Sequence, residues 1–211
     1  MTMARTWARV RVAILVSGRG SNMAALIEAA RADDYPARIV LVLSNEPGAG
    51  GLEIARASGV ETATVAHRVH ADRDAFERAL DARLRQAEAE IVCLAGFMRV
   101  LTPPFVERWL GRLVNIHPSL LPAYRGLRTH ARALADGVRV HGCTAHFVVP
   151  ELDAGPVIAQ GTVPVMPGDD EASLAARVLA QEHIVYPMAL RLVASGAARL
   201  EAGRCVIDEG A

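Results

Sequence analysis

The sequence predicts an α/β fold built on a mostly parallel sheet, and three features of its hydrophobic pattern indicate this. Short apolar runs alternate with helix-like stretches through the first two thirds of the chain. The apolar runs are nearly continuous, as in strands that are buried on both faces of a parallel sheet. After about residue 138, two strand-like runs follow each other with no helix between them. We therefore expect antiparallel strands added to the sheet in the C-terminal third.

The expected elements follow in chain order. Strands are expected at 10–17, 38–44, 60–66, 91–97 and 112–117, and helices at 21–32, 51–59 and 71–90. The antiparallel pair corresponds to 140–149 and 155–165. A last helix spans about 170–193 and opens with acidic residues, which the helix dipole favours. Its expected core stripe consists of Leu174, Val178, Val185, Met188 and Leu192.

The composition indicates a globular chain with no bulk attraction to nucleic acid or to membranes. Of 211 residues, 52% are hydrophobic, and 23 basic residues balance 23 acidic ones. No apolar run approaches the ~20 residues that span a bilayer. Three scattered cysteines without C-x-x-C spacing favour reduced thiols, and we expect a cytoplasmic protein. No linker or repeat interrupts the pattern, so we expect one domain, with residues 1–9 as a flexible tail.

The first expected strand leads into "SGRGSN" (17–22) at the start of a helix. Glycines allow a tight turn there, and free helix N–H groups can hold a phosphate. Met23 replaces the third glycine of the dinucleotide fingerprint, and no Gly-Lys-Ser/Thr follows as in a Walker A loop. Two interpretations stay open: a monophosphate site at Gly20, Ser21 and Asn22, or an ordinary turn capped by Ser21 or Asn22.

Asn115 and His117 end the strand at 112–117, and their side chains point to one face because they are two residues apart. The carboxyl ends of parallel strands open onto the ligand crevice. An amide N–H and an imidazole at that position can together bind an oxygen on which negative charge develops. The alternative, which the strand alone leaves equally open, is a turn-forming asparagine and a half-buried histidine.

A carboxylate can complete this pair. "PELDAGPVI" (150–158) places Glu151 and Asp153 in the loop between the two late strands, where Asp-Ala-Gly also makes an ordinary turn. Asp153 near the pair can orient the imidazole or a proton-carrying water. His141 and His146 fall on opposite faces of a strand and favour a structural role, and no ligand spacing predicts a metal site.

Taken together, these motifs resemble the folate-dependent, single-domain phosphoribosylglycinamide formyltransferase family of purine biosynthesis. The resemblance covers nearly the whole chain and rests on "VAILVSGRGSN", "VCLAGFMRVLTPPFV", "GRLVNIHPSLLPAYRGLRTHARAL", "HGCTAHFVVPELDAGPVIAQ" and "QEHIVYP", in family order. The combination of "NIHPSLLP" with "ELDAGPVI" is highly specific for the formyltransferase superfamily. The implied fold is Rossmann-like, with a phosphate- and substrate-binding half at about 10–110 and a catalytic, folate-binding half at about 111–211.

The resemblance implies formyl transfer from 10-formyltetrahydrofolate, a co-substrate, to the amine of glycinamide ribonucleotide. It implies that Asn115 and His117 stabilise the intermediate's oxygen, while Asp153 holds His117 and helps to move the proton. It implies no metal and no nicotinamide, and it leaves a homodimer open. The implied substrate-binding residues are Gly20, Ser21, Asn22 and Glu182. The implied folate-binding residues are Arg73, Met98, Arg99, Val100, Leu101, Asn115, Val149, Pro150, Glu151, Leu152 and Asp153.

The chain departs from the family pattern at two positions. Ala154 stands where the family has the first glycine of Asp-Gly-Gly, which restricts any positive φ there. Arg128 stands where the family has the first histidine of "GLHTH", so no catalytic role is transferred to it.

Three other functions remain as alternatives. A formyltetrahydrofolate hydrolase would use the same three residues with water as nucleophile, but such enzymes generally carry an N-terminal regulatory domain. A formyltransferase for initiator methionyl-tRNA would need a C-terminal module and a basic surface. A non-catalytic nucleotide-binding module would leave the Asn115, His117 and Asp153 arrangement without a role.

Overall fold

A computed structural model describes residues 8–208 and confirms the predicted α/β fold with added antiparallel strands. The main sheet has the strand order β3-β2-β1-β4-β5-β6-β7. Its strands are β1 (Val10–Val16), β2 (Ala37–Ser44), β3 (Thr62–Thr64), β4 (Ile91–Leu94), β5 (Leu113–His117), β6 (Val140–Phe147) and β7 (Val157–Pro164). The first five strands pair in parallel, and β6 is antiparallel to both β5 and β7.

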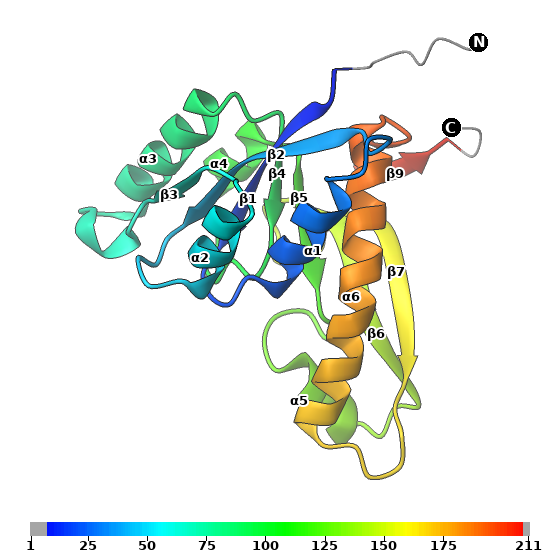
Figure 1. Cartoon of the computed structure of the whole chain (residues 1–211). Coiled ribbons are helices and arrows are strands. Elements are labelled where there is room, and N and C mark those ends of the chain that lie inside the picture. Colours follow the sequence, from blue (N-terminus) through cyan, green and yellow to red (C-terminus); the bar gives the residue numbers. More distant parts are fainter. Residues whose placement is uncertain (1–7, 209–211) are drawn as a thin grey trace, which may run out of the picture.

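Helices cover both faces of this sheet (Figure 1). They are α1 (Ser21–Ala29), α2 (Gly50–Ala57), α3 (Arg73–Gln86), α4 (Pro103–Arg108), α5 (Thr129–Ala135) and α6 (Glu171–Ala194), with a 3-10 turn at His67–Val69. One apolar core joins the sheet to α1, α2 and α6, and a second joins its other face to α3 and α4. Alternate side chains of β1 supply both cores, which explains why the strand is apolar throughout.

Two helices and a two-stranded hairpin lie in stretches where no element was expected. Helix α4 begins with Pro103 and Pro104, which the first turn of a helix tolerates although they resemble breakers. Helix α5 has seven residues, and Arg128 precedes it with a φ of 57° and no side-chain cap. A separate hairpin joins β8 (Ala198–Glu201) to β9 (Arg204–Ile207). Short elements without caps or a long apolar stripe give little signal in the sequence.

Helix α6 begins and packs largely as predicted. Asp170 caps it: its carboxylate accepts from the Ser173 N–H at 2.8 Å, and the Ser173 hydroxyl accepts from the Asp170 N–H at 3.0 Å. The stripe of Leu174, Val178 and Val185 is buried, but the prediction for Met188 was wrong, because that side chain is 45% exposed. The error arises because Tyr186, Ala189 and Leu190 carry the buried face at this end of the helix.

The chain reaches beyond the main body in a narrower lower lobe that contains α5, the far ends of β6 and β7, and the first half of α6 (Figure 1). Strand β5 ends where this lobe meets the body. Residues 1–7 of the predicted tail lie outside the described residues. At the described end of that segment, Arg9 donates a hydrogen bond to the Tyr35 carbonyl oxygen at 3.0 Å.

Candidate active site

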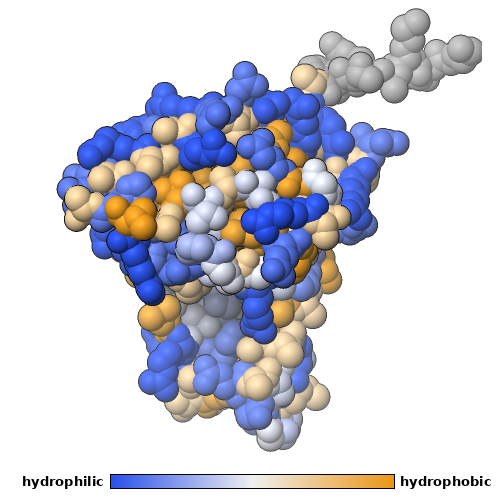
Figure 2. Space-filling model, turned by 60° about the vertical axis from the view of Figure 1, so that its left-hand side comes forward, coloured by the Kyte–Doolittle hydropathy of each residue, from blue (hydrophilic) through white to orange (hydrophobic). Residues whose placement is uncertain are grey.

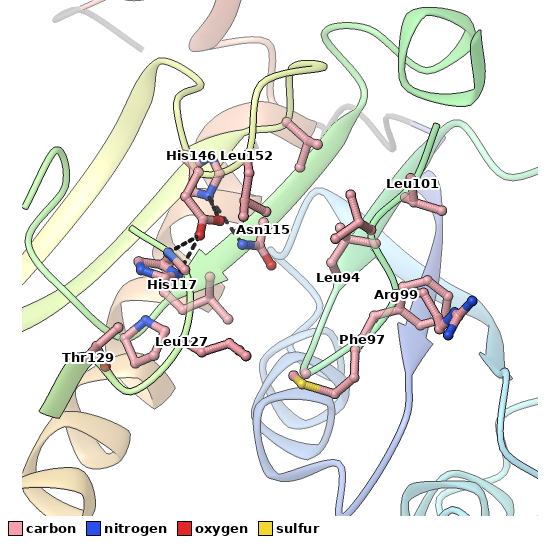
Figure 3. A pocket seen from close by; sticks show the side chains of 18 of the residues that line it. Leu94, Phe97, Arg99, Leu101, Asn115, His117, Leu127, Thr129, His146 and Leu152 are labelled. Carbon is pink, nitrogen blue, oxygen red and sulfur yellow. Dashed lines mark hydrogen bonds and ion pairs between the residues drawn. The ribbon is translucent and has the colours of Figure 1, made fainter. Parts of the chain in front are cut away.

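A cavity of about 560 Å³ lies at the carboxyl ends of β4 and β5, and loops of both halves of the chain line it. The surface is hollowed at the waist between the broad body and the lower lobe (Figure 2). Part of the lining is apolar, and Leu94, Phe97, Leu101 and Val106 contribute to it. Asn115, His117 and His146 lie close together on one side of the cavity, and Arg99 lies on the other (Figure 3). A cavity with apolar walls and a few convergent polar groups is typical of a ligand site.

The structure brings Asn115, His117 and Asp153 together in this cavity. Asn115 and His117 come from β5, and Asp153 from the loop that connects β6 to β7. The His117 Nδ1 atom lies 3.4 Å from Asp153 Oδ2, and both side chains are less than a tenth exposed. This separation is an ion-pair distance, and a small movement would bring the imidazole and the carboxylate within reach for proton transfer.

The other nitrogen of His117 has a defined proton. His117 Nε2 lies 2.9 Å from the carbonyl oxygen of Tyr124, and a carbonyl can only accept, so Nε2 is the donor. The neutral imidazole therefore has its unprotonated nitrogen, Nδ1, on the side of Asp153. Proton exchange at His117 is thereby directed to Nδ1.

His146 is a site residue for which the sequence favoured only a structural role. Its Nδ1 donates to the Phe147 carbonyl oxygen at 2.8 Å, which leaves Nε2 to accept from the Asn115 amide nitrogen at 3.2 Å. Burial lowers the pKa of His146 below its usual value, so the ring stays neutral and fits this role as acceptor. Its Nε2 lies 3.9 Å from Asp153 Oδ1. Because the ring is neutral, this contact is not an ion pair.

The signal that reveals His146 is the register of the sheet. Asn115 and His146 are directly opposite each other in the antiparallel pairing of β5 with β6. Cross-strand partners of this kind have adjacent side chains. The contact with His146 directs one N–H of the Asn115 amide, and the amide retains a second N–H as a donor.

The loop that carries Asp153 is tightly held. Asp153 Oδ2 accepts from the Gly126 N–H at 2.9 Å, and Glu151 pairs with Arg125 at 2.7 Å. Asp153 itself adopts a positive φ of 48°, whereas Ala154 does not, so the alanine causes no strain of the kind considered from the sequence. Gly155 is needed because a Cβ atom there would lie 1.7 Å from the Phe147 carbonyl oxygen.

The predicted folate-binding residues divide into two groups. Those that line the cavity are Met98, Arg99, Val100, Leu101, Asn115, Val149, Pro150, Glu151, Leu152 and Asp153. Arg73 begins α3 and is not among the lining residues. Arg128, the departure from the family pattern, also lines the cavity, together with His130 and Glu171.

The predicted substrate-binding residues form a separate cluster at the start of α1. Gly20, and not Ser21 or Asn22, occupies the N-cap position, with a φ of 79° and no side-chain cap, so side chains do not satisfy the first N–H groups of α1. A Cβ atom at Gly20 would lie 2.7 Å from the Cα of Gly51, which explains the glycine. The Asn22 amide donates to Glu182 Oε2 at 2.6 Å across 160 residues of sequence.

This pair is buried and incompletely satisfied. Glu182 is 6% exposed, and burial raises the pKa of its carboxyl group, although the hydrogen bond from Asn22 acts in the opposite direction. Asn22 Oδ1 is also buried, and it finds no hydrogen-bond donor among the described residues. A buried acceptor without a donor is rare in native proteins and indicates a missing partner.

Comparison with known proteins identifies the class of protein. The sequence model of the family described as "Formyl transferase" matches residues 10–190. The chain therefore belongs to the formyl transferase family, as its motifs predicted.

Two relatives and one solved structure show which members of the family this chain is similar to. The phosphoribosylglycinamide formyltransferase of Escherichia coli is 43% identical over 199 residues, which is 94% of each chain. The trifunctional purine biosynthetic protein adenosine-3 of Bos taurus is 48% identical over 203 residues, and the match covers 95% of this chain but only 20% of that protein. The chain thus spans about a fifth of the length of such trifunctional relatives. Glycinamide ribonucleotide transformylase 1 of Symbiobacterium toebii superposes with a TM-score of 0.91 at 42% identity, over 94% of both chains.

A protein named for the alternative hydrolase function is less similar to this chain in sequence. A formyltetrahydrofolate deformylase of Pseudomonas syringae shares the fold, with a TM-score of 0.88, but only 24% sequence identity, over 96% of this chain and 67% of that one.

Two further observations concern membrane-spanning helices and metal sites. None of the helices within residues 8–208 combines the length and apolar character that crossing a bilayer requires. In the same part of the chain, no three or more His, Cys, Asp or Glu side chains are grouped so that they can hold a metal ion.

Proposed function

We propose that this chain transfers a formyl group from 10-formyltetrahydrofolate to the amine of glycinamide ribonucleotide, giving formylglycinamide ribonucleotide and tetrahydrofolate. The observation that carries the proposal is the convergence of Asn115, His117 and Asp153 on one cavity wall. Family membership and full-length relatives of this type support it. The free thiols of the three cysteines support a cytoplasmic location.

The proposed chemistry begins when the amine attacks the formyl carbon. The carbonyl oxygen becomes an oxyanion and the amine nitrogen becomes cationic, so the site needs donors for the first and a proton acceptor for the second. The second N–H of Asn115 is one donor. The other is Nδ1 of the His117 imidazolium: the ring, which already carries a proton on Nε2, takes up a second proton from solvent at Nδ1 before the attack and keeps it throughout the transfer. One such donor contributes ~10²–10³ in rate.

The proton must then travel from the amine nitrogen to the departing folate nitrogen. Asp153, less than a tenth exposed and beside His117 Nδ1, is the group that accepts it, directly or through a water, and returns it as the carbon–nitrogen bond breaks. Tyr124 keeps His117 Nε2 out of this exchange. Atoms and charge balance without any further reactant.

The two substrates are assigned to the two clusters. The cavity segments 98–101 and 149–153 hold the folate, whose ring system fits apolar walls. The uncapped N–H groups of α1 hold the phosphate, and Asn22 with Glu182 accepts hydrogen bonds from the ribose side of the ribonucleotide.

One assay tests the proposal against its rivals. The protein is incubated with 10-formyltetrahydrofolate, with and without glycinamide ribonucleotide, and folate deformylation is followed. We expect deformylation only when the ribonucleotide is present. Deformylation without it would establish a hydrolase, and none in either mixture would leave a binding module or another acceptor.

A further inference from the structure

The proton on His117 depends on the shape of the segment that follows β5, residues 118–124. This segment turns back, with the Ser119 N–H donating to the His117 carbonyl oxygen at 2.9 Å. It ends at Tyr124, whose carbonyl oxygen accepts from His117 Nε2. A change in the segment that displaces Tyr124 therefore moves the acceptor that selects the tautomer of the imidazole.

A buried hydroxyl group fastens the segment to the sheet. Thr144 lies opposite His117 in the pairing of β5 with β6 and is fully buried. Its hydroxyl donates to the Ser119 carbonyl oxygen at 2.7 Å and accepts from the Leu121 N–H at 3.0 Å. A hydroxyl can accept a second hydrogen bond, and this place is filled from the next strand.

The group that fills it is the amide of Gln160. Gln160 lies opposite Thr144 in the pairing of β6 with β7, and its Nε2 donates to Thr144 Oγ1 at 2.9 Å. The same nitrogen donates to the Leu121 carbonyl oxygen at 3.0 Å. Gln160 thus contacts the 118–124 segment directly at Leu121 and indirectly through Thr144, although Gln160 does not line the cavity.

We propose that Gln160 is a positioning residue: through Thr144 and Leu121 it holds segment 118–124 so that the Tyr124 carbonyl keeps the proton on His117 Nε2. This role concerns the same site as the proposed formyl transfer. Its effect on the reaction rate rests on that proposed function. The chain of contacts runs across three neighbouring strands, β5, β6 and β7, which lie side by side in Figure 1.

Two variants remove the donor in different ways. Gln160→Leu keeps the approximate shape and loses the amide, whereas Gln160→Glu keeps shape and polarity but cannot donate to the Leu121 carbonyl oxygen. Both variants are expected to fold, because Gln160 lies on the edge strand β7 and is exposed to solvent. Thr162→Val, two residues along the same strand face and exposed, is the matched control.

A substitution pair at Thr144 provides rescue by a conservative variant. Thr144→Ser keeps the hydroxyl with its three hydrogen bonds and is expected to behave like the wild type. Thr144→Val removes the hydroxyl and is expected to reproduce the effect of Gln160→Leu.

The primary measurement is the ¹⁵N chemical shift of the His117 ring nitrogens in the full chain, assigned with a His117→Asn variant. The wild type and Thr162→Val should show a protonated Nε2 and, in the neutral ring, an unprotonated Nδ1. In Gln160→Leu and Gln160→Glu both shifts should move toward an average of the two tautomers. Unchanged ring shifts in both variants would overturn the proposal.

Kinetics separate positioning from simple stability. We expect kcat to fall about tenfold or more in the Gln160 variants, since small misplacements of a reacting group are costly. The KM values for both substrates should change by less than about twofold. A lower melting temperature with unchanged kcat would mean a merely structural role. If the wild type transfers no formyl group, the proposed function fails, while the ring shifts still decide the positioning role.

Discussion

The two buried polar clusters of this protein differ in how completely they are satisfied. Around Asp153, groups from four segments are held in place by three hydrogen bonds and by the approach of His117 to the Asp153 carboxylate. The Asn22–Glu182 pair instead has one internal hydrogen bond and an acceptor with no donor among the described residues. The first arrangement is preorganised for chemistry, and the second is suited to receive a ligand. The two clusters should therefore respond differently to substitution.

The largest effect is expected in the Asp153 cluster. His117→Ala or Asp153→Ala should lower turnover by at least ~10², because each removes an acid–base or oxyanion group that acts in the transition state. Steady-state kinetics with both substrates measure this, and circular dichroism should show wild-type folded content. Near-normal turnover in either variant would remove the basis for the assignment.

A moderate effect of another kind is expected in the second cluster. Glu182→Gln removes a buried carboxylate acceptor, and hydrogen bonds to charged groups are worth about 1.5–3 kcal/mol. The KM for the ribonucleotide should rise about tenfold, while kcat stays within about threefold. The KM for the folate is the internal control. A fall in kcat with both KM values unchanged would place Glu182 in the chemistry instead.

The sequence predicted these two clusters to very different degrees. Asn115 and His117 could be found because two polar residues in alternation end an apolar strand, and Asp153 because it follows in a recognisable loop. Asn22 and Glu182 lie 160 residues apart, and only the family resemblance linked them. His146 was not predicted because its contact with Asn115 depends on the register of an antiparallel pair, which local sequence patterns do not contain.

A smaller effect is expected on the pH dependence of stability, through His141 and its neighbour His130. Burial, and then the neighbouring His130, lower the pKa of His141 to about 4. The unfolded chain therefore binds more protons than the folded one between about pH 6.5 and 4. Stability from this group is fully present above pH 6.5 and is lost as the pH falls toward 4.

Chemical denaturation at several pH values measures this dependence. His141→Asn removes the titrating group, and the slope of unfolding free energy against pH between 6.5 and 4 should become smaller than in the wild type. An unchanged slope would show that His141 does not titrate differently in the folded and unfolded states.

The smallest effect is expected at the family departure nearest to Asp153. Ala154→Gly should leave turnover within about twofold, because the positive φ of this loop is at Asp153. The adjacent Gly155→Ala substitution is the contrast: its Cβ would collide with the Phe147 carbonyl oxygen, so turnover and stability should both fall. A large gain in turnover from Ala154→Gly would mean that alanine does constrain the loop.

The most direct test of the central claim is a single-turnover measurement on Asp153→Asn. This substitution keeps the shape of the side chain and an oxygen for the Gly126 N–H, but it removes the proton acceptor beside His117. With both substrates saturating, the rate of formyl transfer should fall by ~10² or more, while both dissociation constants stay near their wild-type values. An unchanged transfer rate, with weaker binding of the ribonucleotide, would contradict the division of roles between the two clusters.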